Sequence, residues 1–304
     1  MKNLSRMGCA VVLSAVGMVG IAGSSQPVLA HWDPGDPYKM HYPQLPDLTP
    51  TGMDVLASRA IPGTNLFKLL ADDFLCTQTG PITDIHIWGS WLNDRLPLVP
   101  DPTGVLVPDP AGVRFKLSIH ADIPAGPNQP YSKPGAELWS AVFGPNDFTV
   151  RLYHTLPPTS QGELFYDPNS QQVMGTDYNI WQYNFPSIKS PFVQQQGTIY
   201  WLDVQAYPAT DDALFGWKTT NPNVTPHFND DAVYGDTIGF YGSLLDPPGW
   251  QELIYPTNHP YAGQSIDLAF VIAPEPGSAM LGVGLTGLLL LRRRPQQAPA
   301  TEPG

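Results

Sequence analysis

The sequence predicts an all-β protein, built as an antiparallel β-sandwich with a jelly-roll-like topology. Several short segments alternate apolar and polar residues with the period of two that a half-buried strand requires. The chain also contains 35 prolines and 28 glycines among its 304 residues, which favours short strands and many turns over long helices. Since strands separated by turn residues are typical of sandwiches, we expect one β domain over residues 31–272.

Residues 1–30 are typical of a secretory signal peptide. Lys2 and Arg6 form a basic start, an apolar run covers residues 7–21, and small or compact residues lead to Ala30. We expect signal peptidase to remove this helix just after Ala30. The alternative is an uncleaved anchor, but the apolar run is shorter than the roughly 20 residues of a membrane span.

The exported part of the chain is acidic and has one cysteine. Cys9 lies in the signal segment, so Cys76 has no intrachain partner for a disulfide. Cys76 shares strand phase with Phe74, which predicts a buried and unreactive thiol. Without the two terminal segments the chain keeps ten basic and 25 acidic residues. This charge repels nucleic acid and anionic membranes, so we expect no nucleic-acid partner.

The clearest strand signals lie in two segments. In residues 113–121 every second side chain is apolar. In residues 83–91 the same period directs Ile85 and Ile87 toward the core and Trp88 away from it. Weaker strand signals occur at residues 148–153, 198–206, 250–255 and 266–272.

One internal repeat interrupts these segments. Residues 98–105, LVPDPTGV, are followed directly by residues 106–113, LVPDPAGV. Two prolines per unit do not fit a central strand, which predicts a duplicated surface loop. The alternative is a repeated cation loop that uses Asp101 and Asp109.

Motifs for catalysis are few. The seven histidines form no HExxH motif, and no GxSxG motif occurs. A GxGxxG match at residues 282–287 has no strand before it, so we assign no dinucleotide site. No two carboxylates have a spacing that selects them as a glycosidase pair. We expect no enzyme activity and no catalytic residues, with a secreted polysaccharide-acting glycoside hydrolase as the alternative.

Acidic residues near strand ends suggest a structural calcium site. Carboxylate oxygens are the ligands that calcium prefers, and several aspartates occur as doublets or out of phase with apolar neighbours. The alternative is that these side chains shape the local backbone at turns. The candidate ligands are Asp72, Asp73, Asp203, Asp230 and Asp231.

Aromatic residues suggest a carbohydrate-binding face. Large rings near amide and carboxylate side chains can stack on a sugar and bond its hydroxyl groups. Most of the rings are expected in the core. We expect the exceptions to be Trp88, Trp201 and Trp217.

The C-terminal segment, residues 273–304, has three parts. A Pro-Glu-Pro motif precedes an apolar run at residues 278–291, and an arginine cluster follows. As a helix the run would be about 21 Å long, against roughly 30 Å of membrane hydrocarbon. The residues of the two flanking motifs are Pro274, Glu275, Pro276, Arg292, Arg293 and Arg294.

This order of parts resembles the PEP-CTERM sorting signal of bacterial exported proteins. The resemblance implies transient membrane insertion through a short C-terminal helix, followed by recognition and cleavage by an exosortase. An ordinary C-terminal anchor is the alternative.

The body of the chain also resembles an uncharacterised domain of bacterial exported proteins, over roughly residues 40–272. The resemblance depends on the segments LADDF, GPITDIHIWGSW, GTIYWLDV, FGWK and NDDAV. It implies a β-rich extracellular module and assigns no catalytic residue. We therefore expect an exported cell-surface or extracellular-matrix protein, structural or carbohydrate-binding, with extracellular polysaccharide as its ligand.

Overall fold

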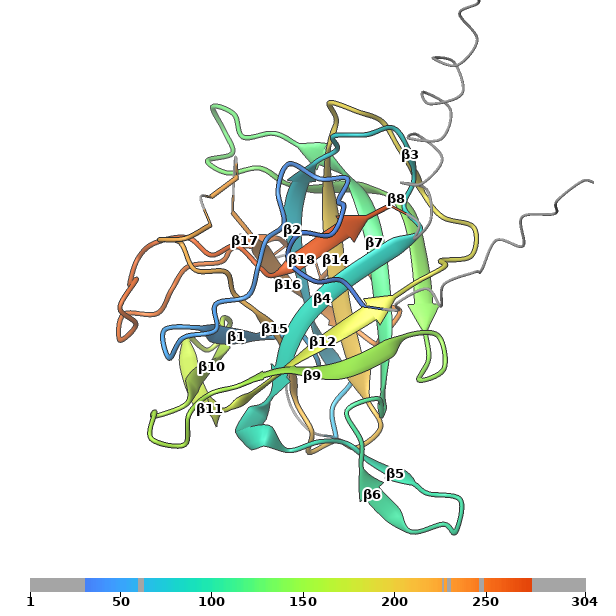
Figure 1. The fold of residues 1–304 in the computed structure, drawn as a ribbon. Coiled ribbons are helices and arrows are strands. Elements are labelled where there is room, and N and C mark those ends of the chain that lie inside the picture. The colour runs from blue at the N-terminus through green and yellow to red at the C-terminus, as the bar shows by residue number, and fades with distance from the viewer. Residues whose placement is uncertain (1–30, 60–62, 226, 229–230, 246–248, 275–304) are drawn as a thin grey trace, which may run out of the picture.

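A computed structural model describes residues 31–59, 63–225, 227–228, 231–245 and 249–274 (Figure 1). In this part of the chain the regular structure is all β apart from one short 3-10 helix, η1 (Leu92–Asp94). The expected signal and C-terminal helices lie outside the described residues. None of the helical structure in the described ranges has the length and apolar character that crossing a membrane requires.

The larger sheet has eight strands and is centred on β4 (Asp84–Trp91). Its order is β11-β10-β1-β15-β4-β12-β9, and β18 shares one edge of β4 with β15. The pair β1–β10 is parallel, whereas the other ladders of this sheet are antiparallel. The remaining strands are β1 (Met53–Leu56), β9 (Thr149–Thr155), β10 (Glu163–Asp167), β11 (Gln172–Asp177), β12 (Asn179–Phe185), β15 (Phe215–Lys218) and β18 (Phe270–Ala273).

The second sheet has six strands in the order β17-β16-β2-β14-β7-β8. Its long central strands lie behind β4, β12 and β9 in Figure 1. Consecutive neighbours pair antiparallel throughout this sheet. Its strands are β2 (Leu66–Leu75), β7 (Val113–Ile123), β8 (Lys133–Phe143), β14 (Ile199–Pro208), β16 (Val233–Ile238) and β17 (Gln251–Glu252).

Aromatic rings from both sheets meet in one core. Phe115 of β7 lies 5.0 Å from Tyr183, 5.5 Å from Phe185 and 5.2 Å from Phe215, measured between ring centroids. These rings meet at steep angles, the edge-to-face geometry that aromatic pairs prefer. The alternation predicted for residues 113–121 is confirmed, because β7 directs its apolar side chains into this core.

The strand predicted for residues 83–91 is confirmed as β4, with Ile85 and Ile87 on the core side and Trp88 on the other face, but that other face is buried as well. On the face away from the second sheet, Trp88 packs edge-on against Trp32 and Tyr153. The segment before β1 also runs along β18, where the backbone N–H of Gln44 donates to the carbonyl of Phe270. A covered outer face lets large apolar residues occupy consecutive positions.

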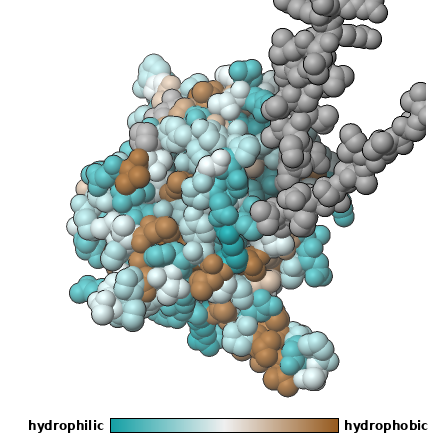
Figure 2. All heavy atoms as spheres, in the orientation of Figure 1, coloured by the Kyte–Doolittle hydropathy of each residue, from teal (hydrophilic) through white to brown (hydrophobic). Residues whose placement is uncertain are grey.

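The repeat forms a protruding hairpin instead of a structureless loop (Figure 1). The first unit contributes β5 (Leu98–Pro100) and the second contributes β6 (Leu106–Pro108), and the two strands pair antiparallel. Prolines fit here because a two-stranded ribbon has no further neighbours to bond. Asp101 Oδ1 accepts hydrogen bonds from the backbone and hydroxyl of Thr103, so its carboxylate shapes the turn. Figure 2 shows the hairpin projecting from the rest of the surface.

A last small sheet pairs β3 (Gly80–Pro81) with β13 (Val193–Gln194). Next to it, Cys76 is buried and unpaired, as predicted. Its thiol donates to the Gln78 carbonyl at 3.3 Å, and burial raises the pKa of the thiol. A protonated, enclosed thiol is a poor nucleophile.

Candidate functional site

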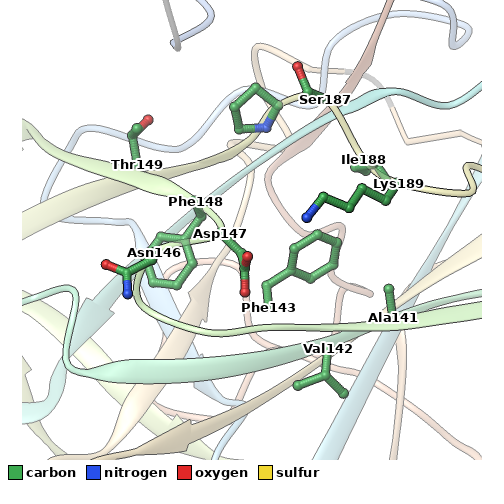
Figure 3. Close-up of a pocket in the computed structure, with 11 residues that line it drawn as sticks. Ala141, Val142, Phe143, Asn146, Asp147, Phe148, Thr149, Ser187, Ile188 and Lys189 are labelled. Carbon is green, nitrogen blue, oxygen red and sulfur yellow. The ribbon is translucent and has the colours of Figure 1, made fainter.

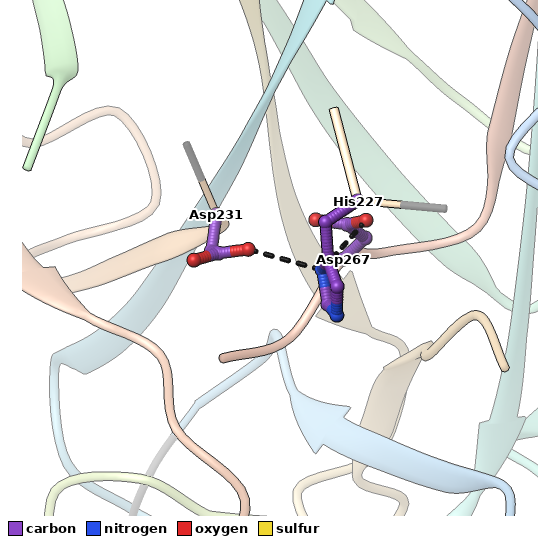
Figure 4. Close-up of side chains that lie close together, drawn as sticks. All are labelled: His227, Asp231 and Asp267. Atoms are coloured by element: carbon purple, nitrogen blue, oxygen red, sulfur yellow. Dashed lines mark ion pairs between the residues drawn. The ribbon is translucent and has the colours of Figure 1, made fainter. Parts of the chain in front are cut away.

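One histidine and two aspartates converge beside the starts of two strands (Figure 4). Asp231 lies two residues before β16, and Asp267 lies three residues before β18. His227 Nδ1 lies 3.0 Å from Asp231 Oδ1 and 3.1 Å from Asp267 Oδ2. Asp267 is buried, whereas a third of the His227 side chain is exposed. Solvent therefore reaches this cluster from the histidine side.

The charges in this cluster depend on each other. Hydrogen bonds to Asp231 and then to Asp267 raise the pKa of His227 to about 10. Burial raises the pKa of Asp267, while His227 opposes that rise. At neutral pH the imidazole is consequently protonated and balances part of the negative charge of the two carboxylates.

A third carboxyl lies next to Asp267. Asp72 is buried, and its Oδ2 accepts hydrogen bonds from Gln44 Nε2 at 2.9 Å and from the Leu268 amide at 2.6 Å. Its Oδ1 accepts from the Asp73 amide at 2.8 Å. Burial, followed by the charges of Asp267 and Asp73, raises the pKa of Asp72 well above its usual range.

A second cluster of three acids surrounds Lys218 in the larger sheet. The strand register creates it, because Asp54 of β1 lies opposite Lys218 of β15 and Glu163 of β10 lies opposite Asp177 of β11. Lys218 Nζ contacts Glu163 directly and lies 3.5 Å from Asp54 Oδ2. All four side chains are fully buried.

The protonation of this second cluster follows from its burial. Burial raises the pKa of Glu163 to about 8, and it raises the pKa values of Asp54 and Asp177 as well. Burial opposes the charge on Lys218, but the three carboxyls raise its pKa above the ordinary value. One lysine thus stays charged among acids that share protons, which limits the net charge inside the sheet.

A groove of about 500 Å³ opens where β8 turns into β9 (Figure 3). The buried rings of Phe143 and Phe148 form part of its wall. Asp147 comes from the turn and Lys189 from the segment after β12, and Figure 3 shows both side chains around the same space. The remaining residues of the lining are Ala141, Val142, Asn146, Thr149, Pro186, Ser187 and Ile188.

Residues 40–273 match the family model described as Domain of unknown function (DUF7901). The chain belongs to this family. Comparison with curated proteins and with solved structures gave no match. The family match covers every strand of both sheets, so the two acid clusters and the groove all lie inside the matched domain.

The predicted calcium ligands do not form one site in this DUF7901 domain. Asp72 and Asp73 lie within β2, near its end, so they point to opposite faces of the sheet. Asp203 is on the face opposite to Asp72, where its Oδ2 lies 2.9 Å from His120 Nε2. Asp230 lies outside the described residues. Asp231 is the predicted ligand that joins a cluster with metal-ligand geometry.

The expectation that three tryptophans lie outside the core is also corrected. Trp88, Trp201 and Trp217 are all fully buried. Trp201 Nε1 donates to Asp122 Oδ1 at 2.9 Å, and Trp217 Nε1 donates to the Ala269 carbonyl at 2.8 Å. A ring with no exposed face cannot stack on a sugar. These tryptophans therefore stabilise the domain and its polar interior.

Sequence analysis missed two members of the first cluster, His227 and Asp267. His227 and Asp231 are four positions apart, a spacing that the histidine-pair motif HExxH does not cover. Asp267 is brought to them across the fold and carries no local signal. Of the sorting-signal residues, Pro274 is described and directly follows β18, whereas Glu275, Pro276, Arg292, Arg293 and Arg294 lie outside the described residues.

Proposed function

We propose that this protein is exported, sorted by an exosortase and held at the cell surface or in the extracellular matrix, where it binds polysaccharide. The observation that carries the binding proposal is the groove between the β8–β9 turn and the segment after β12. Its volume lies within the range of roughly 300–1,000 Å³ that is usual for ligand sites.

The groove combines apolar walls with exposed polar groups. Phe143 and Phe148 offer flat carbon surface, although most of each ring is covered. Asn146, Asp147 and Lys189 supply amide, carboxylate and ammonium groups that can bond hydroxyl or uronate oxygens. Apolar walls with a few placed polar groups are the usual composition of a ligand site, and here the polar groups could bond the hydroxyl groups of a sugar chain.

The export and sorting part of the proposal is supported by where the domain ends. β18 ends at Ala273, and the family match ends at the same residue. The Pro-Glu-Pro motif begins at the next residue, directly after the last strand of the domain. We divide the chain into a signal peptide at 1–30, a domain at 31–272 and a sorting signal at 273–304.

We further propose that the two sheets form a sandwich of jelly-roll type. The aromatic contacts that join β7 to β12 and β15 support face-to-face packing. We do not extend the proposal to hydrolysis, because a glycosidase requires two carboxyl groups across the sugar and Asp147 is the single carboxylate in the described lining of the groove.

Co-sedimentation of the full chain with the extracellular polysaccharide of its own host tests the binding proposal. We expect saturable binding that weakens about tenfold when Asn146 and Lys189 are both replaced by alanine. Lys133→Ala, at the other end of β8, is the charge-matched control and should bind as the parent chain does. If binding is not saturable, or if the control variant weakens it equally, the proposal that the groove binds polysaccharide is contradicted.

The sorting proposal has a separate test. The intact mass of the protein recovered from the surface of its host should lack residues 1–30 and the segment after the Pro-Glu-Pro motif. A recovered mass that includes the arginine cluster would exclude exosortase processing, whether or not the groove binds polysaccharide.

A further inference from the structure

We propose that His227, Asp231 and Asp267 bind one divalent transition-metal ion of the zinc class. This proposal is independent of polysaccharide binding and of sorting. It concerns a site where three donor side chains from two separate chain segments meet within 4.8 Å of one another.

The spacing of the donors fits a small ion. Two ligands that lie about 2.05 Å from a tetrahedral ion are about 3.3 Å apart. His227 Nδ1 lies 3.0 Å from one carboxylate oxygen and 3.1 Å from the other, so small side-chain shifts would create that geometry. Figure 4 shows both carboxylates directed at the same edge of the imidazole ring.

The donor types select the class of ion. Imidazole nitrogen suits zinc, cobalt, nickel and copper, whereas calcium takes six to eight oxygen ligands at longer distances. One nitrogen and two carboxylates therefore favour a zinc-class ion over the calcium that the sequence suggested. Three protein ligands would leave a further coordination position on the exposed side of His227.

A buried oxygen atom without a partner provides the second observation. Asp267 is 2% exposed, and its Oδ1 has no hydrogen-bond partner among the described residues. Leaving a buried carboxylate oxygen without a bond is costly, so such an atom beside two other donors indicates a ligand that satisfies it. Its neighbour Asp72 differs, since both of its oxygens accept hydrogen bonds from the protein.

The position of the site suggests what the ion does. His227 and Asp231 belong to the segment that enters β16 in the six-stranded sheet, and Asp267 belongs to the segment that enters β18 in the eight-stranded sheet. An ion bound here would link the two sheets at the last strand of the domain. The chain leaves the domain from β18, so the link would stabilise the end from which the C-terminal segment starts.

Calorimetric titration of the untagged full chain with zinc, cobalt and calcium chlorides, after treatment with a chelator, tests the site. We expect one equivalent of zinc or cobalt to bind, at least tenfold more tightly than calcium. Bound cobalt should show the intense visible absorption of a tetrahedral site, and zinc should raise the melting temperature.

Variants separate this site from adventitious binding. Asp231→Asn keeps the shape of a partly exposed side chain and should weaken zinc binding at least tenfold, as should His227→Ala. His154→Ala, on β9, is the histidine-matched control and should leave affinity unchanged. The proposal is overturned if zinc does not bind saturably, if calcium binds as tightly, or if Asp231→Asn binds zinc as well as the control does.

Discussion

The two acid clusters of this domain differ in the cation that balances them. Around Lys218, three buried carboxyls share a lysine that is fully enclosed, and the four side chains belong to four adjacent strands. Around His227, two aspartates share an imidazole that solvent reaches. A lysine ammonium cannot leave its cluster, whereas an imidazole can exchange its proton for a metal ion.

This comparison separates a structural role from a binding role. Burial raises the pKa values of the carboxyls in both clusters. The Lys218 cluster is fully enclosed, so we expect it to affect the stability of the fold. The His227 cluster is open to solvent on one side, so we expect it to respond to ions in solution. The following predictions test that division.

The largest effect is expected from Lys218→Met. Without the ammonium group the buried acids have no cation, and removing one partner of a buried charge group typically costs about 3–5 kcal/mol of the free energy of unfolding. The loss should be measured by urea denaturation at pH 8, and it should shrink at pH 5, where the acids take up protons.

Lys116→Met is the matched control for that variant. Lys116 lies 3.5 Å from Glu137 in an ion pair whose acid is well exposed. Exposed pairs contribute about 0–1 kcal/mol, so the change should be small. Equal losses in the two variants would show that Lys218 has no special role.

The pH dependence of stability is the second test. The pKa of Glu163 is raised to about 8 in the folded domain, so between pH 4.5 and 8 the folded state holds a proton that the unfolded state has lost. Its contribution is complete below pH 4.5 and is lost as the pH rises through about 8, with a slope of up to about 1.4 kcal/mol per pH unit. Urea denaturation across this range should show that the free energy of unfolding of the parent chain declines as the pH rises, and that Glu163→Gln reduces this decline. Identical pH slopes for the parent chain and the variant would contradict the prediction.

Gly52→Ala tests how tightly the Lys218 cluster is enclosed. A Cβ atom at this position would collide with Lys218 Nζ and with Glu163 Oε2, and it would lie 2.7 Å from the Asp47 carbonyl. Overpacking of this kind costs about 1–3 kcal/mol. Gly126→Ala is the matched control, because a Cβ atom there meets no atom within 4 Å and, as at Gly52, φ is not in the left-handed region.

The smallest effect on stability is expected from Asp231→Asn without added metal. Its ion pair with His227 is partly exposed, and the second carboxylate, Asp267, keeps its own contact with the imidazole. We expect a loss of about 1 kcal/mol or less in chelator. If Asp231→Asn lowered the free energy of unfolding as much as Lys218→Met does, the two clusters would contribute equally to stability and the proposed division of roles would be wrong.

Strand prediction from the sequence succeeded where one face of a strand is buried. The period of two identified β7 because its apolar residues face the core and alternate with polar ones, most of which are at least partly exposed. The same rule failed for Trp88 of β4, which looked exposed because it is out of phase with Ile85 and Ile87. Trp32 and Tyr153 cover that face, and no local pattern reveals a covering segment from elsewhere in the chain.

The candidate site shows the same limit. Asp231 was identified because acidic doublets are visible in the sequence, but its partners were not. Asp267 lies 36 positions further along the chain than Asp231, and it reaches His227 because the segments before β16 and β18 are joined by a hydrogen bond from the Ala232 amide to the Ile266 carbonyl. The predicted tryptophans failed as binding residues for a related reason, since exposure belongs to the fold and not to the residue type.

By itself the sequence determined the β class, the burial of Cys76 and the order of apolar and charged segments at both ends of the chain, because these follow from local periodicity and composition. The tertiary structure decided which acids meet, which rings are enclosed and where the groove opens. Those properties depend on strand register and on sheet packing, which join residues that no spacing along the chain connects.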